Sequence, residues 1–191
     1  QGYNLYNLGF TAGVIGLIAV AILRINGVEI EPVSIIDTQH RMQLIILVSV
    51  IFFSFLLFGL ILNKWSLRGY PKLLAESGRL LSDFAVMHGS GLALINMGVM
   101  GFLTLAYVLI IRGPVNGPIA GAMITVAGFG AFGKHPRNCI PVMLGSTIAC
   151  LLHRDLQTTG AIVPILFSTT LAPIAGGFGV FAGILAGYLH I

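Results

Sequence analysis

A polar, glycine-rich stretch divides the apolar second half of the sequence and limits how that half can fold. Residues 128–138 read Gly-Phe-Gly-Ala-Phe-Gly-Lys-His-Pro-Arg-Asn, and the sequence is apolar on both sides. Glycine and proline interrupt helices. Backbone that leaves the helix at membrane depth must face protein or a watery cavity, because lipid offers no hydrogen bonds. Such interruptions are typical of permeation and binding sites.

Composition places the chain in a membrane. Of the 191 residues, 57% are hydrophobic and only 8% are charged, with a mean hydropathy of +0.98, whereas soluble domains carry roughly 25% charged residues. We therefore expect a multi-pass protein of the cell membrane in contact with the lipid bilayer. The ten Lys and Arg residues and six Asp and Glu residues stand singly in connections and form no basic face, so nucleic-acid binding is not expected.

The apolar segments predict an all-α, polytopic helical bundle. Residues 1–62 hold two spanning helices, of which residues 42–62 carry no charge. Residues 63–83 carry four cations and leucines at helical spacing, which predicts an amphipathic helix at the membrane interface. Residues 84–191 resemble a repeat unit with broken helices. We treat 1–191 as a single membrane domain, and because both ends look cut, we expect a fragment of a longer chain.

Several segments of residues 84–191 look short or broken for membrane spans. The glycines around Ser90 predict a break before a span that ends near residue 111. Residues 139–152 would form a helix of only about 21 Å, short of a hydrocarbon core of about 30 Å, so we expect a re-entrant segment or half of a broken helix. Residues 161–191 are divided by prolines and glycines, and Gly179, Gly183 and Gly187 form a small-residue face suited to close packing.

Five polar side chains within or beside these segments are our candidates for lining a pore or binding a solute. An Asn amide buried in lipid must find a partner, either across a helix interface or in a polar cavity, and the sequence leaves both roles open. Lys134 and the nearby Arg137 are either topology anchors in a short loop or members of a cavity. The five candidates are Asn7, Asn96, Thr125, Lys134 and Asn138.

Intramembrane enzyme chemistry is an alternative. His88 or His153 with Asp155 would act as acid and base, although paired motifs such as His-Glu-x-x-His are absent from the sequence. No metal-ligand spacing is present, and no residue pattern requires a cofactor. A membrane protein with a purely structural role is the third option. The sequence is also compatible with a homo-oligomer.

Three stretches of this sequence carry a resemblance to a known family. They are residues 2–13, residues 128–145 and the run Thr-Leu-Ala-Pro-Ile at 170–174. The chain resembles bacterial polytopic membrane proteins grouped as domain of unknown function 1576, over essentially its whole length. The resemblance implies a full protein about twice as long, whose upstream half carries a related Gly-Phe-x-x-x-Gly-Lys-x-x-x-Asn stretch. This chain would then be the later half of a duplicated bundle.

Together these features predict a transporter or channel. Two related halves with broken helices in matching places are how many transporters build a site near the middle of the membrane. We expect the solute to be small and polar. A lysine and the amino ends of half-helices favour an anionic or carbonyl-bearing solute.

Overall fold

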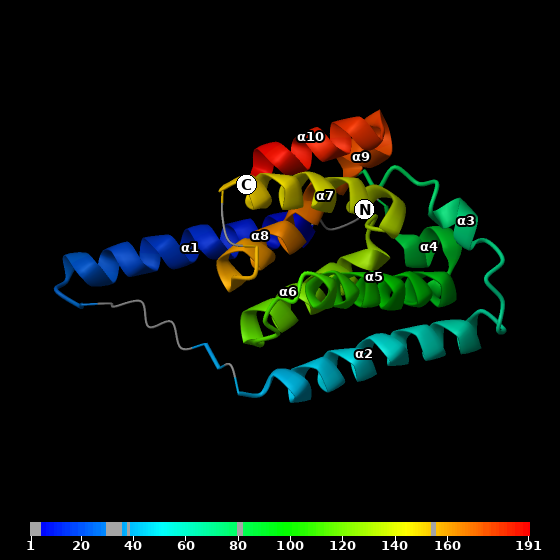
Figure 1. Cartoon of the computed structure of the whole chain (residues 1–191), viewed down its shortest axis with the longest axis horizontal. Helices are drawn as coiled ribbons and strands as arrows, with labels where there is room; N and C mark the ends of the chain where they lie inside the picture. Colours follow the sequence, from blue (N-terminus) through cyan, green and yellow to red (C-terminus); the bar gives the residue numbers. More distant parts are fainter. Residues whose placement is uncertain (1–4, 30–35, 38, 80–81, 154–155) are drawn as a thin grey trace. The chain divides into compact units, whose positions relative to one another are not determined.

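The computed structural model describes residues 5–29, 36–37, 39–79, 82–153 and 156–191, with the side chains from residue 11 onward in these ranges except that of residue 153. These residues form helices and no strand, which confirms the predicted all-α fold (Figure 1). In chain order the elements are α1 (Leu5–Ile25), α2 (Arg41–Leu62), α3 (Tyr70–Leu73), α4 (Phe84–His88), α5 (Ser90–Ile110), α6 (Gly117–Gly128), η1 (Phe129–Ala131), α7 (Pro136–His153), α8 (Thr159–Ser168), η2 (Thr169–Leu171), α9 (Ala172–Phe178) and α10 (Val180–His190).

The chain divides into two compact units, Gln1–Ile35 and Ile36–Ile191. The first unit contains α1, an apolar helix of 21 residues with Arg24 in its last turn. Nearly all of its described side chains are exposed, including Leu17 and Ile25. An apolar helix without a polar face is stable only when lipid or protein surrounds it. The second unit contains all the other helices.

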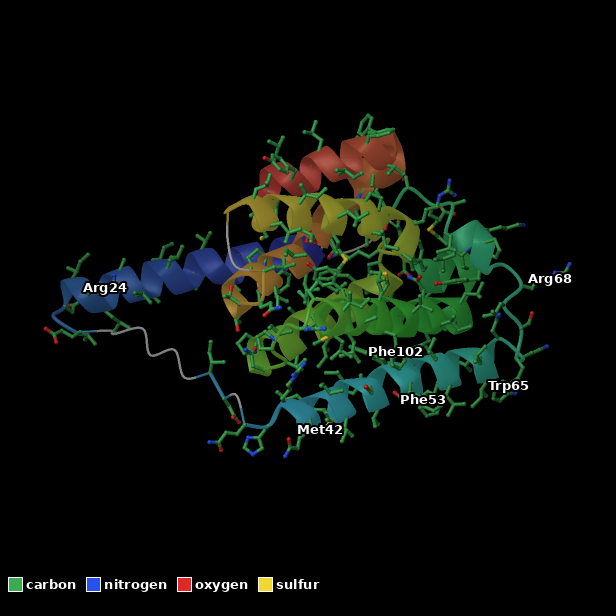
Figure 2. The ribbon with its side chains drawn as sticks, viewed as in Figure 1. Arg24, Met42, Phe53, Trp65, Arg68 and Phe102 are labelled. Atoms are coloured by element: carbon green, nitrogen blue, oxygen red, sulfur yellow. The ribbon has the colours of Figure 1, made fainter. Side chains whose placement is uncertain are left out.

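Among the residues that the structure describes, three helical stretches are long and apolar enough to cross a membrane, which indicates a multi-pass membrane protein. They are α2 with 22 residues, α5 with 21 residues, and the run Thr159–Phe178, in which α8, η2 and α9 follow one another over 20 residues. The helix α2 confirms the span predicted for residues 42–62 and begins one residue earlier. Figure 2 shows Met42 and Phe53 on α2, and both side chains are more than half exposed, as a surface that faces lipid requires.

The core of the second unit lies between α2, α5, α6, α7 and α8. The helix α2 packs along α5, and α5 packs against α6. Phe52, Met100, Ile119 and Met123 are fully buried in this core, and the Phe52 ring meets Phe102 edge to face at 5.9 Å. Such close packing fixes α5 and α6 relative to each other, so side chains between them hold a defined position.

A second helix pair, α7 and α10, packs through glycines. A Cβ on Gly187 would lie 2.0 Å from the Val142 carbonyl oxygen, and one on Gly145 would lie 1.9 Å from the Ile184 carbonyl oxygen. The Ser146 hydroxyl donates a hydrogen bond of 2.8 Å to the Gly187 carbonyl. Small residues permit this approach of two backbones. The predicted small-residue face therefore forms around Gly187.

Two glycines end short helices by the same backbone conformation. Gly89 separates α4 from α5 with φ 91° and ψ 150°, and Gly179 separates α9 from α10 with φ 92° and ψ 174°. Residues with a side chain rarely adopt this conformation. The break predicted near Ser90 is therefore confirmed at Gly89. A Cβ on Gly179 would meet no atom within 4 Å beyond its chain neighbours, unlike one on Gly183 or Gly187, so Gly179 is not part of the packed face.

Residues 63–83 differ from the predicted amphipathic helix. Only α3, four residues long, is helical among the residues described in this range. Backbone with positive φ at Lys64, Trp65, Gly69 and Gly78 interrupts the helical path. Leucine periodicity suggested a continuous helix, but these left-handed positions stop a right-handed one.

The polar stretch at 128–138 does break the helix, over fewer residues than its sequence suggested. The helix α6 tightens into η1, and the chain turns at Gly133 with φ 93° before α7 begins at Pro136. Proline suits the first turn of a helix, where its missing N–H costs nothing. As a result α7 has 18 residues, or about 27 Å, which is longer than the expected segment 139–152.

Candidate functional site

The helix interruption at residues 128–138 is here called the break. Lys134 is its most unusual residue, because its charged side chain is only 1% exposed. Its Nζ atom donates hydrogen bonds to the Thr169 hydroxyl at 2.9 Å and the Thr170 hydroxyl at 3.5 Å. The same atom lies 5.0 Å from the centroid of the Phe129 ring, within the range of a cation–π interaction. Phe129 opens η1 and Thr169 opens η2, so Lys134 joins the two 3₁₀ interruptions.

Burial has a clear electrostatic consequence for Lys134, which stands in a connection outside the three candidate spans. Burial lowers the pKa of the Lys134 amine to about 8 from 10.5, while the nearby Cys139 opposes this decrease slightly. At neutral pH the amine is therefore still mainly charged. A protein keeps a buried charge at a considerable cost in free energy, so this charge requires an explanation beyond packing.

Asn96 on α5 holds the break in place through two hydrogen bonds to its backbone. Its side-chain amide donates to the Gly130 carbonyl at 2.6 Å and to the Lys134 carbonyl at 2.7 Å. Its side-chain oxygen accepts from the Tyr70 hydroxyl at 3.0 Å. These bonds satisfy carbonyl groups that the interrupted helix leaves without a helical partner. Of the two roles open for this residue, the structure shows the one that joins helices.

Asn138 closes the turn within its own segment. Its side-chain oxygen accepts from the His135 backbone N–H at 3.0 Å, and its amide donates to the Gly133 carbonyl at 2.9 Å. The first of these bonds is the reciprocal half of a capping box, in which a side chain in the first helical turn reaches back to the capping residue. Asn138 therefore fixes the start of α7.

The segment formed by residues 76–79, here called the strap, lies against this break. A Cβ on Gly78 would come within 2.3 Å of the Gly133 carbonyl oxygen, and one on Gly176 would come within 2.1 Å of the Ser77 carbonyl oxygen. Arg79 places its guanidinium carbon 5.4 Å from the centroid of the Phe178 ring. The strap therefore contacts both the turn before α7 and the helix α9.

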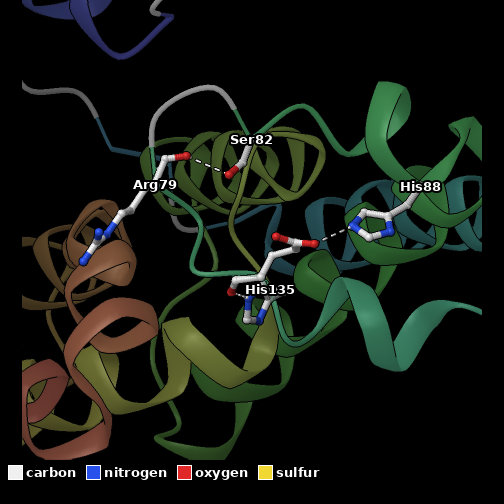
Figure 3. A network of polar contacts seen from close by, with 5 residues as sticks. Arg79, Ser82, His88 and His135 are labelled. Carbon is white, nitrogen blue, oxygen red and sulfur yellow. Dashed lines mark hydrogen bonds and ion pairs between the residues drawn. The ribbon is translucent and has the colours of Figure 1, made fainter.

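A small titratable cluster holds the first residue of the strap (Figure 3). The Nε2 atom of His88 lies 3.2 Å from a Glu76 carboxylate oxygen. The Nε2 atom of His135 lies 2.9 Å from the Glu76 backbone oxygen. The Phe84 ring lies next to both imidazoles, at 5.7 Å from that of His88 and 6.3 Å from that of His135.

The five predicted site residues do not all come together. Asn96, Lys134 and Asn138 meet at the break through the bonds given above. Thr125 is half-buried on α6, and its hydroxyl donates to the Gly121 carbonyl of its own helix at 2.8 Å. Among the described contacts, none joins Thr125 to the break. Asn7 belongs to the part of α1 whose side chains lie outside the description.

The structure also separates the two cations of the sequence motif. Lys134 is buried, whereas Arg137, three residues later, is exposed. Their burial differs because Lys134 precedes α7, whereas Arg137 lies on the outer face of α7. The two residues therefore have different surroundings, and only Lys134 belongs to the interior of the break.

Sequence reasoning missed Thr169, Thr170, Tyr70 and Glu76 as members of this site. Two consecutive threonines in a largely apolar segment were a usable signal, because a buried hydroxyl such as that of Thr169 needs a partner. The contact between the strap and the break had no comparable local signal. It joins residues nearly sixty positions apart, such as Glu76 and His135.

The residues of the alternative acid–base mechanism are only partly described. His88 bonds to Glu76, and the side chain of His153 and the whole of Asp155 lie outside the described residues. Within the described ranges, no group of three or more His, Cys, Asp or Glu side chains is placed to hold a metal ion.

A separate groove of about 210 Å³ lies between α5 and α7 and is almost entirely apolar. Tyr107 and Thr147 contribute its hydroxyl groups, and these bond to each other at 2.8 Å. Thr147 donates its hydrogen to the Met143 carbonyl at 2.7 Å and accepts from Tyr107, so both hydroxyls are already bonded and this groove offers little to a polar solute. Its lining residues are Leu103, Ala106, Tyr107, Ile110, Ile140, Met143, Leu144 and Thr147.

The fold and the break together define a class: a multi-pass, all-α membrane protein with a buried lysine between interrupted helices. The chain belongs to the family described as "Protein of unknown function (DUF1576)", which it matches over residues 1–25 and 62–191. The matched residues contain the break, the strap and η2, whereas most of α2 lies in the unmatched range. Neither a curated protein nor a solved structure matches the chain.

Proposed function

We propose that this protein is a transporter or channel of the cell membrane and that a small polar solute passes at the break around Lys134. One observation carries the proposal: the buried ammonium of Lys134 bonds to Thr169 across two 3₁₀ interruptions that follow α6 and α8. Interrupted helices that cross near one charged side chain are a common way to build a solute site in a membrane. Buried ionisable groups with strongly shifted pKa values are concentrated at functional sites.

The chemistry of the break favours an anionic or carbonyl-bearing solute. The Lys134 ammonium supplies the hydrogen-bond donors, and two threonine hydroxyls accept from it. The Thr169 hydroxyl donates its own hydrogen to the Leu166 carbonyl at 2.6 Å. The amino end of α7 follows Lys134 directly, and the positive end of its helix dipole adds to the same potential. An anion that displaced the hydroxyls from the ammonium would gain a charge-assisted bond in a site with little competing water.

A duplicated architecture fits the local geometry of the breaks. Gly89 and Gly179 interrupt successive helices with nearly the same φ and ψ, which supports an internal repeat within residues 84–191. In this proposal the chain forms one half of a larger bundle, and the solute site is completed where the two halves face each other.

A flux assay tests the proposal. The full-length protein is reconstituted into liposomes, and stopped-flow light scattering follows uptake of acetate, phosphate, urea or glycerol. We expect protein-dependent uptake of at least one solute, with a preference for an anion, and a decrease of about tenfold or more in Lys134→Met, since the loss of one charge-assisted contact is worth about 1.5–3 kcal/mol. Lys72→Met is the matched control, because Lys72 is exposed on α3.

Two results would overturn the proposal. If no solute enters faster than in protein-free liposomes, a structural role becomes the better account. If Lys134→Met and Lys72→Met both keep the full rate of uptake, solute passes elsewhere, and the buried lysine is not part of the pathway.

A further inference from the structure

His135 contains a buried nitrogen that the hydrogen bonds of the break do not use. Its side chain is 1% exposed. Its Nε2 faces the Glu76 backbone oxygen at 2.9 Å, and a carbonyl oxygen only accepts hydrogen bonds, so Nε2 carries the hydrogen. In the neutral ring Nδ1 then bears a lone pair. This atom is buried with no hydrogen-bond partner among the residues that the structure describes.

An unpaired buried acceptor costs about 1–3 kcal/mol and calls for an explanation. With Nε2 already fixed on Glu76, Nδ1 is the atom at which the ring gains a proton. We propose that Nδ1 of His135 is a proton-binding site and that its protonation releases the strap, residues 76–79, from the break. The inference rests on the proposed function, because the strap lies against the same break that the solute would pass.

The geometry explains why a proton would loosen the strap. The neutral ring holds the strap through the bond to the Glu76 backbone oxygen, and Gly78 packs directly on Gly133. A protonated ring would place a second N–H donor, and a positive charge, in a buried position without an acceptor. The charge would also stand at the amino end of α7, where the helix dipole disfavours cations. Leaving the interior relieves all three penalties.

The charged and titratable groups around the ring come from three elements. Glu76 faces it from the strap, His88 stands behind Glu76 on α4, and Arg137 lies in the first turn of α7. Burial lowers the pKa of His135 below 6.5; the Glu76 backbone bond opposes this decrease, Arg137 adds to it, and the Glu76 charge opposes it. The closed strap is therefore favoured above about pH 6.5 and is weakened as the pH falls through the lowered pKa.

Spin labels on the strap side and on α7 would report the movement without any solute. Cysteines replace Ala75 and Ile148, which are exposed, in the full-length protein in lipid nanodiscs, and pulsed electron resonance measures the distance between labels at about pH 8 and about pH 5. We expect one distance at the higher pH and a second, longer one at the lower pH. The ratio of molecules with the longer distance to molecules with the shorter distance should grow by up to about tenfold for each pH unit of decrease, as release by one proton requires.

Two variants identify the proton site. His135→Gln keeps an amide donor for the Glu76 carbonyl but cannot be protonated, so the longer distance should vanish at about pH 5. His88→Gln removes the neighbouring imidazole and should leave the longer distance in place. The inference is overturned if the wild-type protein shows one distance throughout, if His135→Gln still opens, or if His88→Gln alone prevents opening.

Nitrogen NMR of the wild-type protein with labelled histidine needs no variant. We expect His135 to carry its hydrogen on Nε2 at about pH 8 and to gain a proton on Nδ1 as the pH decreases. A ring protonated on Nδ1 at the higher pH would contradict the inference even if His135→Gln fails to fold. A strap that opens in a protein that passes none of the tested solutes would contradict the proposed function alone.

Discussion

Lys134→Met should stabilise the protein while it impairs solute passage. The pKa of the buried amine is about 8, against 10.5 for an ordinary lysine. One unit of pKa corresponds to about 1.4 kcal/mol, so a charged amine at pH 7 costs the folded protein about 3 kcal/mol. Methionine keeps a similar length and apolar stem without the charge. Burial and Cys139 account for this shift, and the bonds of the ammonium to Thr169 and Thr170 offset part of the cost, so we expect a net gain of about 1–2 kcal/mol.

The two buried cysteines, Cys139 and Cys150, provide a direct assay. A thiol-reactive fluorescent dye labels them only when the protein unfolds, so fluorescence during heating gives a midpoint temperature. For a protein of this size 1 kcal/mol corresponds to about 2–4 °C, and Lys134→Met should therefore unfold at a temperature roughly 2–8 °C higher. Lys72→Met should have the same midpoint temperature as the wild-type protein, because the Lys72 side chain is exposed.

The difference in stability between Lys134→Met and the wild-type protein should also depend on pH, and the direction of the change follows from the pKa. Because folding lowers the pKa of Lys134, the wild-type protein gains stability as the pH rises from about 8 to 10.5. The advantage of Lys134→Met should shrink over the same range. A variant less stable than the wild-type protein at pH 7 would refute this reasoning, since it would show that the ammonium holds the two interruptions together.

Two further sets of substitutions test the packing around the site with the same assay. Asn96→Leu should destabilise the protein by roughly 3 kcal/mol, because two carbonyls of the break lose their donor. Tyr70→Phe removes one hydrogen bond and should cost about 1 kcal/mol. Equal effects of the two substitutions would contradict the role of Asn96 in holding the break. Gly187→Leu should cost about 3 kcal/mol or more by forcing α10 away from the Val142 carbonyl. Gly121→Ala on α6 meets nothing within 4 Å and should stabilise by about 0.5–1 kcal/mol; a destabilised Gly121→Ala would show that the space around α6 is not open.

The spans and breaks of the fold were predictable because their signals are local. An uncharged apolar run of the right length predicts α2 without any knowledge of its neighbours. The break before α7 follows from Gly133, which adopts a positive φ, and from Pro136, which favours the start of a helix. Local signals failed for residues 63–83, where the strap must approach Gly133 and Gly176 closely and cannot remain helical.

The candidate site was only partly predictable for the same reason. A lysine in a polar interruption is visible in the sequence, but its bond to Thr169 joins residues 35 positions apart. Periodicity and composition describe single segments, whereas packing decides which segments meet. Asn96 and Asn138 illustrate the other difficulty. Their amides could equally line a cavity or bond to backbone, and the contacts of the folded chain show the backbone bonds.

Access of water to residue 134 tests the central claim most directly. Lys134→Cys is introduced into the full-length protein with Cys139 and Cys150 replaced by Ala, and a charged, water-soluble thiosulfonate reagent is added to sealed liposomes. A pathway through the break predicts that the new thiol reacts in the folded protein at about pH 8, where part of an accessible thiol is present as the reactive thiolate. A thiol that stays unreactive until the protein unfolds, while Lys72→Cys reacts at once, would contradict the account.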